Sequence, residues 1–230
     1  MSVPVWRPLR RSVGFVEPII RRRGGVVSES HTPEAYLLLS AAVAKIDPTG
    51  AERIVRDGMA KFPAAHGFHL ALGELHMMHG EDAEAAYEFQ WEMLRAGEAR
   101  PDGSRAARRF ADLLHESNAP HELESLVRAV AAMQTDARAA RDIFEKMLQE
   151  RGNRFILELY LAEASQRDGD RVEAMRLYRG LIEHDPYFVP AYVQLAELKE
   201  QAGAASEANE LMQKARFIDP DHWRLKLRSP

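Results

Sequence analysis

The sequence contains no cysteine and no long apolar run. The absence of cysteine excludes a disulfide framework, a thiol nucleophile and a thiolate-bound metal. Apolar runs are only a few residues long, far short of the ~20 that cross a bilayer, and the N-terminus lacks the apolar core of a secretory signal. Because no nucleophile elbow and no glycine-rich phosphate loop is present, we expect no catalytic residues and no cofactor.

The composition is that of a folded protein. The 230 residues are 46% hydrophobic with a net charge of −4, enough for one sizeable core or two small ones. From Thr32 onward apolar residues recur at three- and four-residue steps, which predicts about eleven helices and no sheet. Turn signals such as those at residues 47–50, 101–103 and 118–120 are expected to separate the helices. We expect the protein to be cytoplasmic.

Residues 1–30 form a basic arm. Up to residue 27 the arm has six arginines against a single acidic residue, Glu17, a net charge of +5 that leaves −9 for the rest. Its prolines and the Gly24-Gly25 pair disfavour regular structure. An arginine-rich start also leaves organellar import open, although prolines interrupt the amphipathic helix of such signals. The candidate binding residues of the arm are Trp6, Arg7, Arg10, Arg11, Arg21, Arg22 and Arg23.

The C-terminal half repeats itself after 34 residues. A fixed period of this length predicts a solenoid, in which helical units too small to fold alone stack on their neighbours. Small side chains at Ala196 and Ala208 are expected to let paired helices approach closely. The repeated pairs are Leu161/Leu195, Ala162/Ala196, Gly169/Gly203, Ala174/Ala208 and Pro186/Pro220.

These residues resemble the tetratricopeptide repeat. Leu72-Gly73 with Gly80, Ala85 and Phe89 marks one unit near His66, and units starting at 155 and 189 match again. A weaker unit covers residues 32–65. The resemblance implies an all-α, right-handed superhelical solenoid of antiparallel helix pairs over residues 31–222. Residues 223–230 then form a tail, which we expect to cap the last repeat; a second interaction tail is the alternative.

The repeat register breaks within residues 101–153. Phe110-Ala111-Asp112 suits a first helix, whereas Ala140, Phe144 and Met147 suit the second helix of a unit that begins at His121. Both framings leave one helix unpaired. We expect either helix 104–117 or helix 136–150 to be unpaired, and to bend the solenoid or divide it into two blocks.

The histidine cluster of His66, His69, His76 and His79 does not predict a metal site. His69 and His76 are seven residues apart, about 10.5 Å along one helix face, whereas two ligands of one zinc ion need spacings of three or four. Both occupy positions where the repeat carries packed aromatic rings. We therefore expect the rings to fill space between helices.

The resemblance also assigns a binding groove on the first helix of each unit. The ninth position is a glutamate in each unit, at Glu74, Glu163 and Glu197, with Asp112 joining them in one framing. An acidic groove with apolar patches favours a basic or amphipathic protein segment and no small-molecule substrate. The alternative is that these glutamates only increase solubility. The predicted groove residues are Leu70, Glu74, Met77, Met78, Leu159, Glu163, Gln166, Arg167, Val193, Glu197, Glu200 and Gln201.

The sequence therefore predicts a non-enzymatic scaffold or adaptor in a multiprotein complex, with the arm as a second attachment. The alternative is an assembly factor that binds RNA or an anionic membrane through the arm. Two further readings of the arm are that it docks into a partner as an extended segment or folds back onto the acidic body.

Overall fold

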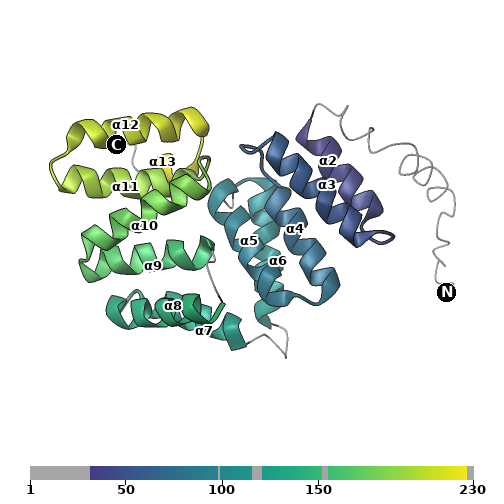
Figure 1. The fold of residues 1–230 in the computed structure, drawn as a ribbon, viewed down its shortest axis with the longest axis horizontal. Coiled ribbons are helices and arrows are strands. Elements are labelled where there is room, and N and C mark those ends of the chain that lie inside the picture. Colours follow the sequence, from purple (N-terminus) through teal and green to yellow (C-terminus); the bar gives the residue numbers. More distant parts are fainter. Residues whose placement is uncertain (1–31, 98, 116–120, 152–154, 227–230) are drawn as a thin grey trace, which may run out of the picture.

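The computed structural model describes residues 32–97, 99–115, 121–151 and 155–226, and all regular elements in these ranges are helices (Figure 1). The basic arm lies outside them. The helices are α2 (Pro33–Val43), α3 (Pro48–Lys61), α4 (Phe68–His79), α5 (Asp82–Ala96), α6 (Pro101–His115), α7 (His121–Ala132), α8 (Ala137–Arg151), α9 (Phe155–Asp168), α10 (Arg171–His184), α11 (Val189–Gln201), α12 (Ala205–Ile218) and α13 (Trp223–Lys226).

Two of the expected turns are first turns of helices. Residues 48–50 open α3, where the Asp47 side chain caps the helix by accepting from the Gly50 N–H at 2.8 Å. Residues 101–103 open α6. Proline fits the first helical turn because it lacks only an N–H that would have no partner there. A proline after a polar residue therefore marks a helix start at these two places.

The helices form antiparallel pairs, and α6 is the unpaired one. In the first part of the chain α2 packs with α3 and α4 with α5, and α6 then packs on α5 and also contacts α4. A second stack pairs α7 with α8, α9 with α10 and α11 with α12. The prediction of an all-α helical repeat is confirmed. The unpaired helix is the one expected near 104–117, and Phe144 lies in the second helix of the α7–α8 hairpin.

Small residues set the spacing within the hairpins. Ala196 and Ala208 are buried between α11 and α12, as predicted. In the α4–α5 hairpin a Cβ atom at Gly73 would clash with the ring of Phe89, so glycine is required for the close approach. Each fully buried leucine or phenylalanine around these positions contributes about 1.5–3 kcal/mol to folding.

The solenoid is divided into two blocks. We name α2–α6 the N-terminal block and α7–α13 the C-terminal block; Figure 1 shows them side by side, with α5 facing the C-terminal block. The largest hydrophobic cluster runs through both blocks, from Leu70 and Phe89 to Phe155 and Leu198. The blocks thus share one core instead of forming one continuous curved array.

Candidate functional site

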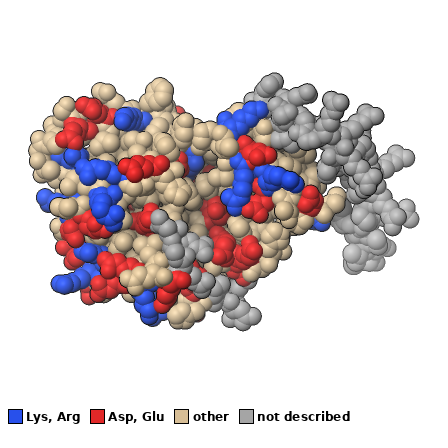
Figure 2. All heavy atoms as spheres, viewed as in Figure 1, with Lys and Arg blue, Asp and Glu red and all other residues tan. Residues whose placement is uncertain are grey.

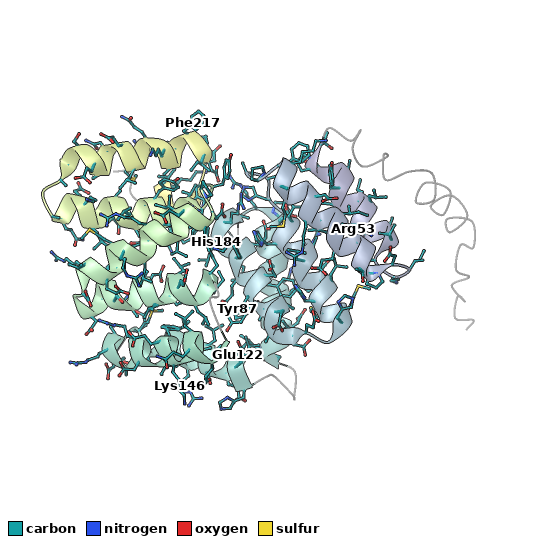
Figure 3. All side chains as sticks on the ribbon, in the orientation of Figure 1. Arg53, Tyr87, Glu122, Lys146, His184 and Phe217 are labelled. Atoms are coloured by element: carbon teal, nitrogen blue, oxygen red, sulfur yellow. The ribbon has the colours of Figure 1, made fainter. Side chains whose placement is uncertain are left out.

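The inner face of the C-terminal block is covered by a helix of the N-terminal block. This face is formed by α7, α9 and α11, the first helices of three hairpins, and α5 contacts all three. The Tyr87 hydroxyl on α5 donates to buried Glu122 on α7 at 2.8 Å, and Figure 3 shows the two residues where the blocks meet. The face that the repeat pattern assigns to a ligand is therefore largely occupied by the chain itself.

Aromatic rings form the middle of this contact. Trp91 on α5 stacks on His69 of α4 on one side and on Phe155 of α9 on the other, with centroid separations of 4.2 and 4.0 Å. His69 is 4% exposed, and its Nδ1 lies 2.7 Å from a carboxylate oxygen of Glu88. The prediction that this histidine is a packed ring is confirmed. Within the described ranges no cluster of three metal-ligating side chains forms.

The short helix α13 occupies the rest of the inner face. Arg224 pairs with Glu163 of α9 at 3.0 Å, and both side chains are mostly buried. In the amide orientation that satisfies its neighbours, Gln194 of α11 accepts from Arg224 Nη1 at 2.5 Å and donates to Glu197 at 2.9 Å. Of the predicted groove glutamates, Glu163 thus pairs with an arginine of the same chain, and Glu197 is linked to that arginine through Gln194.

The residues beside Arg224 tie α13 to the end of α5. His222 Nε2 and Trp223 Nε1 lie 3.2 and 3.3 Å from the Leu94 carbonyl oxygen, which accepts from both. The backbone N–H of Arg224 donates to His222 Nδ1 at 3.2 Å. His222 is therefore a neutral imidazole with its proton on Nε2, and burial lowers its pKa to about 4.

A partly buried polar cluster joins the two blocks at the corner between α5 and α6. Arg100 donates two hydrogen bonds to Asp219, at 2.6 and 2.8 Å, and a third to His66 Nε2 at 2.8 Å. Because a guanidinium only donates, the proton of His66 is on Nδ1. Burial and the nearby Arg100 charge lower the pKa of His66 to about 4. Glu92 accepts from the Gly67 N–H at 2.9 Å, and burial raises its pKa.

The N-terminal block has an open groove on its own inner face. The groove has a volume of about 340 Å³ and runs between α2, α4 and α6. It is separate from a cavity of about 430 Å³ that lies where the two blocks meet, beside Trp223. Leu38 is 72% exposed and Met78 50% exposed at the edges of the groove. Its lining residues are Leu37, Leu38, Ser40, Ala41, Ala44, Lys45, Gly67, Leu70, Ala71, Glu74, Leu75, Met78, Asp102 and Arg105.

The rim of this groove carries both signs of charge. Lys45 and Arg105 lie with Glu74 and Asp102 around an apolar floor, and Arg109 of α6 approaches Glu74 at 3.6 Å. Figure 2 likewise shows basic and acidic side chains interspersed over the C-terminal block. The groove suits a segment with an apolar face and polar flanks better than a uniformly basic one.

Comparison with known proteins identifies the repeat. Residues 165–228, from the end of α9 through α13, match the family model of the tetratricopeptide repeat. Residues 165–228 therefore form a tetratricopeptide-repeat segment. The resemblance drawn from Leu195, Gly203 and Pro220 is confirmed by this match. The segment includes Arg224, so α13, which occupies part of the inner face, belongs to the matched region.

Solved structures with some similarity to this chain include the following two. A crystal structure of MamA is 19% identical, covers 76% of this chain and 91% of that chain, and has a TM-score of 0.40. The APC/C hetero-tetramer Cut9-Hcn1 is 10% identical over 94% of this chain and 44% of that chain, with a TM-score of 0.45. No curated protein sequence matches this chain.

The predicted groove residues separate into two sets. Leu70, Glu74 and Met78 line the open groove, while Met77 packs against the central core. In the C-terminal block, Leu159 on α9 and Val193 on α11 are buried. Gln166 accepts from the Tyr178 hydroxyl at 3.0 Å, Arg167 donates to the Met133 carbonyl at 3.3 Å, and Glu200 and Gln201 are exposed at the end of α11.

The contributions of α2 and α6 to the open groove were not predicted. The ninth and thirteenth positions of the repeat, applied to the weak unit 32–65, fall on Ser40 and Ala44, which line the groove, whereas the fifth and twelfth fall on Tyr36 and Val43, which do not. The signal was therefore present on α2. Asp102 and Arg105 had no such signal, because α6 belongs to no pair. The arm residues Trp6, Arg7, Arg10, Arg11 and Arg21–Arg23 lie outside the described residues.

None of the described helices combines the length and the apolar composition that a membrane crossing requires.

Proposed function

We propose that this protein is a non-enzymatic protein-interaction scaffold whose open groove between α2, α4 and α6 binds an amphipathic segment of a partner protein. The observation that carries the proposal is the contrast between the two inner faces. The face of the C-terminal block is filled by α5 and α13, whereas the groove of the N-terminal block keeps Leu38 and Met78 72% and 50% exposed. Exposed apolar side chains around a concave, charged-rimmed surface are typical of a docking site.

The lining indicates the chemistry of the partner. Leu37, Leu70 and Leu75 make an apolar floor that would receive aliphatic or aromatic side chains at helical spacing. Met78 adapts its shape to different apolar groups because its side chain is unbranched and flexible. Glu74 and Asp102 would pair with basic residues of the segment, and the alternating charges of the rim would set its register.

The basic arm supports the scaffold as a second attachment. A second weak contact on the same chain raises the effective concentration of the first, so the complex is held more tightly than by the groove alone. Arginines interleaved with Trp6 and apolar residues also suit RNA or an anionic membrane, which is the alternative function. Loss of binding on deletion of residues 1–30, with the groove intact, would favour that alternative.

Groove-specific substitutions test the proposal. We expect Leu38→Asp with Met78→Asp, both at exposed positions, to leave folding unchanged and to abolish retention of a partner from native extract. Val172→Asp is the matched control, because Val172 is 77% exposed but lies on α10 of the other block. Proteins retained by the intact chain and the control but lost with the groove variant would then be purified and titrated. Equal retention by all three chains would contradict the proposal.

A further inference from the structure

The inner face of the C-terminal block carries a second site, distinct from the open groove. We propose that it is a peptide-binding site that residues 223–226 occupy as an internal ligand, and that it takes a partner segment of the same chemistry: an arginine between an aromatic and an aliphatic residue. This site does not depend on the proposed function of the N-terminal groove, since the two share none of their lining residues.

The arginine subsite is a built one. Arg224 enters between α9 and α11, pairs with Glu163 at 3.0 Å and is met by Gln194, which in turn binds Glu197. The side chains of Arg224 and Glu163 are only 13% and 16% exposed. An ion pair shielded to this degree discriminates strongly for an arginine, because any neutral residue would leave the carboxylate without its partner.

The neighbouring residues add an aromatic and an aliphatic subsite. The Trp223 ring lies against Gly97, donates its Nε1–H to the Leu94 carbonyl and has the Arg224 guanidinium over it at 5.0 Å. Leu225 is 7% exposed and packs with Val189 and Val193 of α11. Three consecutive side chains therefore enter three different surroundings, as in recognition of a short linear segment.

Several features make this internal segment replaceable. It is a helix of four residues, too short to be stable by itself, so its position depends on those three side chains. No described helix follows it along the chain, so none of the described helices has to move when it leaves. Arg224 Nε is buried without a hydrogen-bond partner, so the internal arginine does not use the site fully. A partner arginine that satisfies all of its donors would compete with it.

A peptide titration on the full chain tests the inference. The site is vacated by Trp223→Ala, Arg224→Ala and Leu225→Ala, and folding is checked by circular dichroism. The probe is a fluorescent peptide with the sequence of residues 221–230. We expect the vacated chain to bind it at least tenfold more tightly than the intact chain. Adding Glu163→Gln to the vacated chain should weaken binding at least tenfold, whereas Glu74→Gln, in the other groove, should not.

Two results would overturn the inference. One is a folded vacated chain that binds the peptide no better than the intact chain. The other comes from hydrogen exchange on the intact chain, which gives a result even where the vacated chain fails to fold. We expect the amides of residues 224–226 to exchange at least tenfold faster than those of α11. Exchange of both segments at one common rate would mean that the segment leaves only when the protein unfolds, and that it is a fixed part of the core.

Discussion

Trp91 of the N-terminal block lies flat against Phe155 of the C-terminal block, with ring centroids 4.0 Å apart and ring planes 1° from parallel. His69 covers the other face of Trp91 at 4.2 Å. Three rings from α4, α5 and α9 thus form one continuous stack across the junction. Because the stack belongs to both blocks, the blocks should unfold together.

Removing the middle ring tests this coupling. We expect Trp91→Ala to reduce the free energy of unfolding by about 3 kcal/mol, since it removes a large side chain from between two packed rings. Urea unfolding monitored by circular dichroism measures the change. Phe217→Ala is the control, because Phe217 is 91% exposed on α12 and its loss should cost less than about 0.5 kcal/mol. If Trp91→Ala reduces the free energy of unfolding as little as Phe217→Ala does, the stack does not join the blocks.

The Tyr87 hydroxyl stabilises a buried carboxylate at the same junction. Tyr87→Phe keeps the ring but deletes the donor that lies 2.8 Å from Glu122. We expect a loss of about 1–3 kcal/mol, because the carboxylate, on a residue that is 8% exposed, loses a hydrogen bond without gaining water. Thermal and urea unfolding measure it. Tyr187→Phe, at a residue 36% exposed, should change stability by less than about 0.5 kcal/mol.

Two glycines differ in both backbone conformation and surroundings. Gly97 and Gly80 both have φ of 74°, but ψ is 154° at Gly97, in a region that essentially only glycine adopts, and 22° at Gly80, in the left-handed helical region. A Cβ atom at Gly80 would meet nothing within 4 Å, whereas at Gly97 it would lie 2.5 Å from Trp223 Cδ1. We expect Gly80→Ala to cost about 1 kcal/mol. Gly97→Ala should cost clearly more and shift the tryptophan fluorescence. An unchanged tryptophan fluorescence in Gly97→Ala would show that Trp223 does not pack on Gly97 in solution.

His222 makes the attachment of α13 depend on pH. Burial lowers its pKa from 6.5 to about 4, so the unfolded chain binds a proton more readily than the folded one between these values. The stability that comes from the neutral ring is therefore complete above pH 6.5 and is lost as pH falls toward 4. His66 changes in the same direction, with a pKa of about 4.

Urea unfolding between pH 4 and pH 7 measures this dependence. The two lowered histidine pKa values should make the free energy of unfolding rise with pH across that range, and the raised pKa of Glu92 opposes part of this rise. In His222→Gln the rise should be smaller, because only His66 remains of the two histidines with a lowered pKa. Gln keeps a donor for the Leu94 carbonyl. His121→Gln is a suitable control, since His121 is exposed at the start of α7. If the stability of His222→Gln depends on pH as strongly as that of the intact chain, the lowered pKa of His222 is contradicted.

The local parts of the structure were predictable because their signals are local. Apolar spacing predicts the helices, and the pair Asp47-Pro48 marks a helix start once proline is treated as a first-turn residue. The positional rule of the repeat also found Leu70, Glu74 and Met78. It missed Asp102 and Arg105, because the groove there is completed by a helix that follows no repeat pattern.

The sequence by itself determined the helical repeat, since the 34-residue period and the small residues at Ala196 and Ala208 require stacked hairpins. Only the tertiary structure decided that α6 is unpaired and that α5 and α13 fill the inner face of the C-terminal block. The reason is that contacts such as Arg100 with Asp219 join residues 119 positions apart, and no spacing within one helix encodes them. Which inner face stays open therefore depends on how the two blocks pack.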